Sequence, residues 1–258
     1  MIGRLLVIAG SDSSAGAGLQ ADLKTAQRLG VYAQTAVTAV TAQDTMRVYA
    51  FEAMAPDLVR GQIEAALRDI GADAVKIGML ANAGIAAAVA DALMETDIPL
   101  VLDPVLVSSS GTPLLDHAGI EVLKRRLLPR ALLVTPNLPE SETLVGIRPE
   151  DDHAIRQAAQ AFALLGARHV LFKGGHGAGA TVRDVLIAAD GHASIFESPR
   201  QGTRHTHGTG CVLSTAIACG LAQGRAMAEA VKQAHAFVQQ AIRTAPGLGR
   251  GHGPLNLG

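Results

Sequence analysis

Short apolar runs alternate with helix-like segments along most of this chain, and that alternation limits its possible folds more than any other feature. Runs of strand length occupy residues 4–9, 35–40, 74–77, 100–102, 131–134 and 169–172. Helix-like segments separate them at residues 19–29, 56–70, 81–94, 114–127 and 151–165, and two more begin at Cys211 and Met227. This order predicts an α/β fold with three layers, in which helices cover both faces of a mostly parallel sheet.

Composition and length set the remaining limits. The chain has 258 residues, of which 48% are hydrophobic and 17% charged, and no linker-like stretch divides it. We therefore expect one domain over residues 1–258. A formal net charge of -1 gives no reason to expect nucleic acid or a membrane as a partner. Cys211 and Cys219 would lie too far apart on one helix to form a disulfide, which favours a reducing cytoplasm.

The sequence motifs follow the ends of the predicted strands. Because the carboxyl ends of parallel strands share one edge of a sheet, where such folds bind ligands, these loops should meet. Between residues 184–189 and 192–196, Asp190-Gly191 predicts a hairpin. The loops that we expect to converge are residues 10–18, 41–44, 78–80, 103–104, 136–140 and 173–175 and the turn at Gly208.

A glycine-rich turn, His207-Gly208-Thr209-Gly210-Cys211, runs directly into an apolar helix. The first N–H groups of a helix lack partners within it, and the helix dipole adds positive charge at the same end. Gly208, Thr209 and Gly210 are therefore candidates for an anion hole. Cys211 stands where a thiol pKa tends to fall, so it is a candidate base. The alternative is a tight turn followed by a small buried cysteine.

Four further residues suit phosphate chemistry. Asn137 and Glu140 are three residues apart in Thr-Pro-Asn-Leu-Pro-Glu, and Asp103 follows another strand. These three are candidates for holding Mg²⁺, which keeps most of its waters. Asn137 and Glu140 could instead form only a helix cap. Lys173, before Gly174-Gly175, is placed to meet a phosphate, although an ordinary surface lysine would fit the same pattern.

Two other patterns are weaker. Gly16-Ala17-Gly18-Leu19-Gln20-Ala21 matches a dinucleotide-binding pattern, but it stands six residues beyond the first strand, so we expect a loop that covers the substrate. His205, His207 and Cys211 could be imagined as metal ligands, but no fourth partner accompanies them. We expect both histidines to face solvent.

Together these residues make a set suited to phosphoryl transfer: an anion hole, a lysine, a site for Mg²⁺ and a base. The chain contains neither the P-loop pattern G-x-x-x-x-G-K-[ST] nor the H-R-D and D-F-G signatures of protein kinases.

At this point the sequence resembles a known family, the hydroxymethylpyrimidine/phosphomethylpyrimidine kinases of the ribokinase-like superfamily. The resemblance covers nearly the full length and rests on motifs in a fixed order. These motifs are residues 9–12, 16–25, 41–43, 76–80, 103–105, 135–140, 173–176 and 207–211.

The resemblance implies a ribokinase-like fold and the ATP- and Mg²⁺-dependent phosphorylation of 4-amino-5-hydroxymethyl-2-methylpyrimidine, and then of its monophosphate, in thiamine biosynthesis. It implies that Cys211 replaces the aspartate base of related sugar kinases. It also implies a homodimer. The substrate-binding residues that it implies are Gln43, which would read the aminopyrimidine edge, with Asp22, Met79, Gly10 and Ala42.

Two alternatives remain at this stage. A pyridoxal kinase of the same fold would also act on a hydroxymethyl group attached to a flat heteroaromatic ring. A ligand sensor could keep the fold and lose turnover, although it would not need Lys173, Asn137, Glu140 and Cys211.

Overall fold

The computed structural model describes residues 2–108, 110–176 and 179–258. Within these residues, nine strands form one sheet in the order β3-β2-β1-β4-β5-β6-β7-β8-β9. β2, β1, β4, β5, β6 and β7 pair in parallel, whereas β3, β8 and β9 add antiparallel edges. The strands are β1 (Arg4–Asp12), β2 (Tyr32–Gln43), β3 (Val48–Ala53), β4 (Ala74–Ile77), β5 (Leu100–Leu102), β6 (Leu133–Val134), β7 (His169–Phe172), β8 (Thr181–Ile187) and β9 (Ala193–Pro199).

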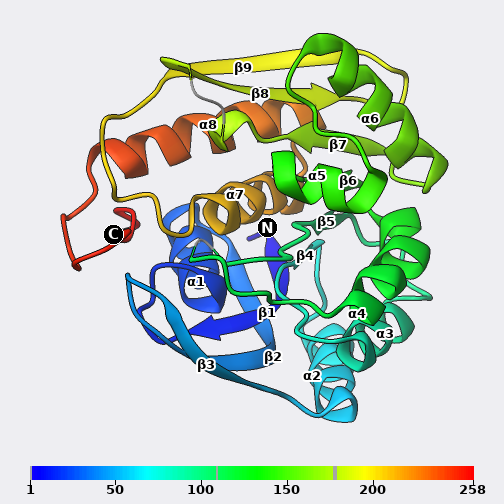
Figure 1. Ribbon diagram of the computed structural model, residues 1–258. Helices are drawn as coiled ribbons and strands as arrows, with labels where there is room; N and C mark the ends of the chain where they lie inside the picture. The colour runs from blue at the N-terminus through cyan, green and yellow to red at the C-terminus, as the bar shows by residue number, and fades with distance from the viewer. Residues whose placement is uncertain (1, 109, 177–178) are drawn as a thin grey trace.

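Helices cover both faces of this sheet, which confirms the predicted three-layer α/β/α architecture (Figure 1). One face packs against α2 (Pro56–Asp69), α3 (Ala83–Ala92) and α6 (Asp152–Leu164), near the short α4 (His117–Val122). The other packs against α1 (Gly18–Arg28), α7 (Thr209–Ala222) and α8 (Met227–Arg243). A further helix, α5 (Leu138–Val145), follows β6.

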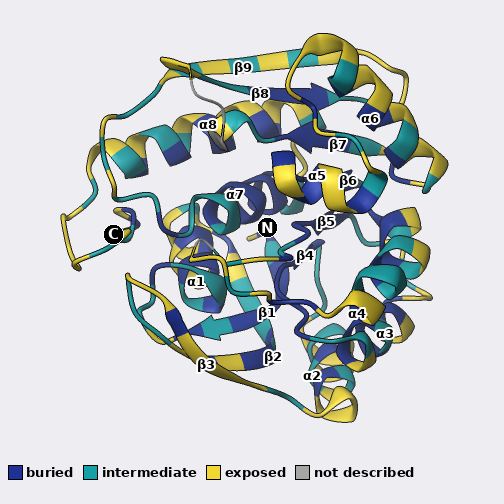
Figure 2. Ribbon diagram, viewed as in Figure 1, coloured by how far each residue is buried: buried dark blue, intermediate teal, exposed yellow. Residues whose placement is uncertain are grey.

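Strand β1 shows how the sequence builds two cores. Its side chains alternate between the faces of the sheet, as the two-residue period of a strand requires. Leu6 and Ile8 enter the core beneath α2 and α3, whereas Leu5, Val7 and Ala9 enter the core beneath α1 and α7. A continuous apolar run is therefore the expected sequence of a strand that is covered on both sides. Figure 2 shows the same burial along the central strands and along α7.

The structure differs from the sequence prediction at several elements, and α5 was not among the predicted helices. The helix expected over residues 114–127 is shorter, because Asp116 caps α4 at His117 and Val122 ends it. A π-helical turn over Leu123–Leu127 follows, and then a 3₁₀ turn that contains Pro129, which has no N–H to continue an α-helix. The prediction also missed β3, a mostly exposed edge strand without a buried apolar run.

Among the described residues, no helix combines the length and the apolar composition needed to cross a bilayer.

Candidate active site

A cavity of about 780 Å³ lies at the carboxyl edge of the parallel strands. The end of β2 and the loops that follow β1, β4, β5, β6 and β7 all contribute to its lining, together with the turn before α7. The predicted convergence of the motif-bearing loops is therefore confirmed. The sequence-predicted site residues that line the cavity are Gly10, Gln43, Met79, Asp103, Asn137, Glu140, Lys173, Gly208, Thr209, Gly210 and Cys211.

The turn before α7 has the geometry of an anion hole. Gly208 is the N-cap residue, with φ 83° and ψ 5°, and α7 begins at Thr209. A β-carbon at position 208 would overlap the carbonyl oxygen of Gly16, so only glycine fits both the space and the left-handed backbone. Within the described residues, the N–H groups of Gly210 and Cys211 have no hydrogen-bond partner. These two amides are therefore available to an anionic ligand.

Lys173 places a positive charge beside this turn. A β-carbon built on Gly210 would lie 3.4 Å from Lys173 Nζ, so the ammonium is adjacent to the start of α7. Lys173 Nζ lies 2.7 Å from Asp103 Oδ1 and 3.5 Å from Glu140 Oε2. Burial opposes the charge, but the two carboxylates outweigh it and hold the pKa of Lys173 above its ordinary value. Lys173 therefore meets a ligand as a cation.

Both carboxylate oxygens of Asp103 accept hydrogen bonds from protein side chains. Its Oδ1 accepts hydrogen bonds from Thr135 Oγ1 at 3.0 Å and from Lys173, and its Oδ2 accepts one from Ser214 Oγ at 3.2 Å. Burial would raise the pKa of Asp103, but the charges of Lys173 and Lys76 together with the hydrogen bonds from Lys173 and Thr135 keep that pKa below the ordinary value. Asp103 therefore positions Lys173 at the edge of the cavity, and its predicted role in holding Mg²⁺ stays a prediction.

Asn137 and Glu140 form the helix cap that was the alternative interpretation. The Glu140 N–H donates to Asn137 Oδ1 at 2.8 Å, and the Asn137 N–H donates to Glu140 Oε2 at 2.7 Å, which is a capping box at the start of α5. Both residues nevertheless line the cavity. Burial, partly offset by Lys173, raises the pKa of Glu140 to about 7.

The residues present fit a cation that is held mainly through water. In the part of the chain that the structure describes, no three His, Cys, Asp or Glu side chains converge as a metal cage. The second carboxylate oxygen of Glu140, Oε1, has no protein partner among the described residues. An ion that keeps most of its own waters, as Mg²⁺ does, matches such a sparse set of ligands.

Cys211 differs from the prediction in its protonation. Its thiol is only partly exposed, and the Gly18 N–H donates a hydrogen bond to the sulfur. Burial raises the pKa of Cys211 to about 11, although the nearby Lys76 opposes that rise. The predicted fall in pKa is therefore wrong, because desolvation by burial is the largest influence on this thiol and raises its pKa. Cys211 and Cys219 are both free thiols, as expected from their spacing.

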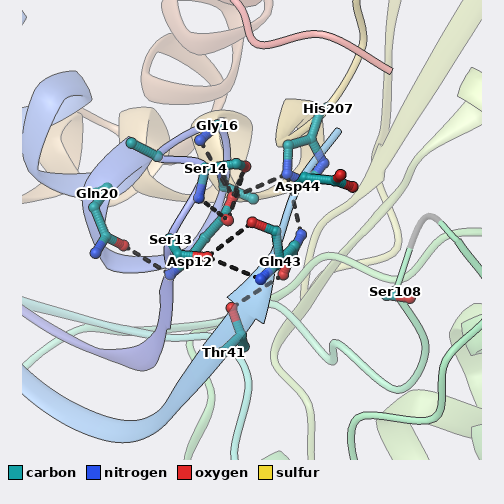
Figure 3. A network of polar contacts seen from close by, with 12 residues as sticks. Asp12, Ser13, Ser14, Gly16, Gln20, Thr41, Gln43, Asp44, Ser108 and His207 are labelled. Atoms are coloured by element: carbon teal, nitrogen blue, oxygen red, sulfur yellow. Dashed lines mark hydrogen bonds and ion pairs between the residues drawn. The ribbon is translucent and has the colours of Figure 1, made fainter. Parts of the chain in front are cut away.

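An unpredicted network connects the first loop to the glycine turn (Figure 3). Asp12 ends β1, and its carboxylate accepts hydrogen bonds from the N–H groups of Ser14, Gly16 and Ala17. His207 Nε2 lies 2.9 Å from Asp12 Oδ2, which corrects the expectation that His207 faces solvent. Burial would raise the pKa of Asp12, but the hydrogen bonds from His207 and Ser14 hold it below its ordinary value.

Gln43 lies beside this network at the end of β2. Its side-chain Nε2 is 3.2 Å from His207 Nε2, and its backbone N–H and carbonyl both pair with Ser13 Oγ at 2.8 Å. Gln43 is therefore fixed in the lining of the cavity.

The role of Asp12 could have been predicted from the run Asp12-Ser13-Ser14 after a strand, because an aspartate there commonly caps the following turn with its own side chain.

Two expected substrate-binding residues do not line the cavity. Asp22 is fully buried, and its carboxylate pairs with Lys76 at 2.8 Å and with Thr215 at 2.6 Å. Ala42 is exposed on β2, where it faces Ala50 of β3. We therefore correct both predictions. Gly10 and Met79 do form one wall, since a β-carbon on Gly10 would lie 2.8 Å from Met79 Sδ.

The fold and the site together define a kinase with a ribokinase-like fold. The structure resembles that of an ADP complex of Bacillus subtilis pyridoxal kinase, with a TM-score of 0.90 and 34% identity over 99% of this chain and 97% of that one.

The sequence comparisons identify the family within this class. The phosphomethylpyrimidine kinase family model matches residues 12–256, and the chain belongs to this family. It is 44% identical to the hydroxymethylpyrimidine/phosphomethylpyrimidine kinase of Haemophilus influenzae, over 98% of this chain and 96% of that protein. It is also 46% identical to a thiamine biosynthesis bifunctional protein of Geobacter sulfurreducens, over 98% of this chain and 52% of that protein.

The two glycines of the turn should respond differently to the same substitution. Gly208→Ala places a β-carbon against the Gly16 carbonyl at a positive φ, so it should lower the free energy of unfolding by about 1–3 kcal/mol or more. Gly210→Ala meets only ordinary contacts, at 3.4 Å and beyond, and should cost less than about 1 kcal/mol. Urea unfolding measures both. Equal losses would contradict the geometry described for the turn.

Proposed function

We propose that this chain, as one domain over residues 1–258, transfers the γ-phosphoryl group of ATP to the hydroxymethyl oxygen of 4-amino-5-hydroxymethyl-2-methylpyrimidine. It then transfers a second phosphoryl group to the monophosphate, in thiamine biosynthesis. The observation that carries this proposal is the 44% identity, over nearly the whole chain, to a kinase named for both substrates. The arrangement of the cavity supports it.

The phosphate end of the cavity lies at Lys173 and at the turn formed by residues 208–211. A transferring phosphoryl group spreads negative charge over its oxygens, so catalysis depends on positioning and on charge stabilisation. The free amides of Gly210 and Cys211 and the ammonium of Lys173 supply both. The ADP bound to the Bacillus subtilis pyridoxal kinase supports an adenine nucleotide as the donor here.

Asn137 and Glu140 would hold Mg²⁺ through its waters at the start of α5. When bound, the ion neutralises charge on the nucleotide phosphates. The capping box fixes the Glu140 carboxylate at the cavity wall, next to Lys173. This arrangement keeps the carboxylate and the ammonium on the same side of the site.

Gln43 would read the aminopyrimidine edge. Its amide provides one donor and one acceptor, the pattern that an amino group beside a ring nitrogen requires. Ser13 fixes the Gln43 backbone, and the wall made by Gly10 and Met79 would accept the flat ring. Cys211, at the start of α7, would take the proton from the hydroxymethyl group during the first transfer in its thiolate form, which is the minor form because burial raises the pKa of the thiol to about 11.

We also propose a homodimer. β3 is an edge strand whose backbone has β2 on only one side, and the neighbouring surface exposes several large apolar side chains. A second copy of the chain would cover this surface, which includes Val40, Met46, Tyr49 and Phe51. The two free thiols support a reducing compartment, the cytoplasm.

Pyridoxal is the second candidate substrate, favoured by the likeness to pyridoxal kinase structures. The ligand-sensor alternative is weaker, because the cavity keeps Lys173, Glu140 and Cys211 together at one end.

Release of ADP tests the substrate assignment. The purified chain, with ATP and Mg²⁺, should release ADP with the hydroxymethylpyrimidine and with its monophosphate. Activity with pyridoxal alone would replace the proposed function with the pyridoxal alternative. No release with any of the three compounds, from a protein that is shown to be folded, would favour the sensor.

Gln43→Leu serves as the control within that panel. It leaves the aminopyrimidine edge without partners in the cavity, which should weaken binding of the pyrimidine by about 1–3 kcal/mol. Pyridoxal lacks the amino group and should lose much less. Equal losses for the two compounds would remove Gln43 from recognition.

The Mg²⁺ requirement should depend on pH through Glu140. Burial raises the pKa of this carboxyl to about 7, so below that pH it is mostly protonated and holds a cation poorly. The Mg²⁺ concentration for half-maximal activity should therefore rise by up to roughly tenfold per pH unit as the pH falls below 7. In Glu140→Gln the amide oxygen can still cap α5, so the requirement should be high and nearly independent of pH. If this variant showed the wild-type dependence of the Mg²⁺ requirement on pH, Glu140 would have only a structural role as a helix cap.

A further inference from the structure

A buried ion pair that has no role in the reaction described above lies beneath the catalytic turn. Lys76 of β4 and Asp22 of α1 both have fully buried side chains, and Lys76 Nζ lies 2.8 Å from Asp22 Oδ2. Lys76 nevertheless borders the cavity, whereas Asp22 does not. The cation therefore stands between its counter-ion and the space where the reaction takes place.

Two helices connect this pair to Cys211. Thr215 follows Cys211 by four residues on α7, so the two share a face of that helix, and Thr215 Oγ1 donates to Asp22 Oδ1 at 2.6 Å. On α1, the Gly18 N–H donates to the Cys211 sulfur, and Asp22 follows Gly18 by four residues. Cys211 and the ion pair are thus held together from both helices.

The charges around Cys211 are closely balanced. The charged groups that face its thiol from the surrounding elements are two cations and two carboxylates: Lys76, Lys173, Asp22 and Asp103. The sulfur also accepts the Gly18 N–H. A thiolate would add one uncompensated negative charge to a desolvated site. Removing a single neighbouring charge should therefore change the thiolate population strongly.

Stability alone does not explain why this pair is kept. Two fully buried charges lose their hydration. Such a pair commonly contributes no more to the free energy of unfolding than apolar side chains of the same size would. Lys76 also limits its surroundings, because a β-carbon at Gly78 would lie only 3.0 Å from Lys76 Nζ. The cation is held in a restricted space directly beside the reacting groups.

We propose that Lys76 is a positioning residue that sets the balance between thiol and thiolate at Cys211, with Asp22 as the counter-ion that limits its effect. The functional part of this inference rests on the proposed role of Cys211 as the base for the hydroxymethyl group. In that role, the Lys76 ammonium stabilises the thiolate that accepts the hydroxyl proton. The substrate oxygen bonds to the γ-phosphorus of ATP, the bond from that phosphorus to the ADP oxygen breaks, and ADP and the protonated thiol are left.

The rate of Cys211 alkylation by iodoacetamide, followed against pH without substrate, tests the coupling. A Cys219→Ala background leaves one thiol, and adding Cys211→Ala gives the blank. Asp22→Asn leaves the Lys76 charge less compensated and should make alkylation about tenfold faster near pH 8. Asp22→Asn with Lys76→Met removes both charges and should make it slower than in the parent by about threefold or more, because the cation is the stronger influence.

Thr215→Val is the matched control. It removes a hydrogen bond to Asp22 but no charge, so the rate of alkylation should follow the parent profile. If Lys76 and Asp22 acted only through packing, Thr215→Val should change that rate as much as the charge variants do. Thermal melting confirms that each variant is folded. A parent-like profile in the double variant, or slower alkylation in Asp22→Asn, would overturn the proposal. If Cys211→Ala phosphorylates the alcohol at the wild-type rate, only the base assignment fails, since alkylation is measured without turnover.

Discussion

The ion pair between Asp103 and Lys173 is the interaction on which the rest of the site depends. Asp103 follows β5, Lys173 follows β7, and Thr135, which also donates to Asp103, follows β6. Ser214 connects the same carboxylate to the first turns of α7. One buried aspartate therefore joins three neighbouring strand ends to the helix whose N-terminus forms the anion hole. Asp103 thus contributes to the fixed geometry between the ammonium and the free amides.

This arrangement separates two requirements of phosphoryl transfer. In the proposed reaction, the amides of Gly210 and Cys211 and the charge of Lys173 would stabilise a phosphoryl group by electrostatics, and none of them would need to change protonation. The Cys211 thiol is the group placed to exchange a proton, and its pKa of about 11 shows that burial keeps it protonated at rest. The same cavity can thus serve an acceptor that must lose a proton and one that is already anionic.

The sequence was sufficient to predict the layers of the fold and the edge where the site lies. Apolar runs such as residues 4–9 can be recognised because both faces of β1 are buried, and parallel strands necessarily bring their carboxyl ends together. β3 escaped prediction because an exposed edge strand carries no such run. The glycine turn before α7 could be located from its motif, because its glycines and the helix start that follows them are local features of the sequence.

The errors in the site arise from burial and from distant partners. Asp22 looked like a ligand residue in its motif, but Lys76, 54 residues away in sequence, holds it in the core. His207 looked exposed until the fold placed Asp12 beside it. For Cys211, the helix N-terminus is visible in the sequence, whereas the desolvation that outweighs it depends on neighbours from other elements. Charge and burial at a site are properties of the assembled fold.

The most direct test of the account compares the two successive phosphorylations in Cys211→Ala, which keeps the turn's amides and removes only the thiol. Time courses by phosphorus NMR, started separately from the alcohol and from the monophosphate, give the two rates. The first transfer should slow by ~10²-fold or more, the usual scale of general-base help, while the second should change much less because a phosphate oxygen needs no base. Equal losses in the two steps would contradict the account and assign Cys211 to shaping the anion hole.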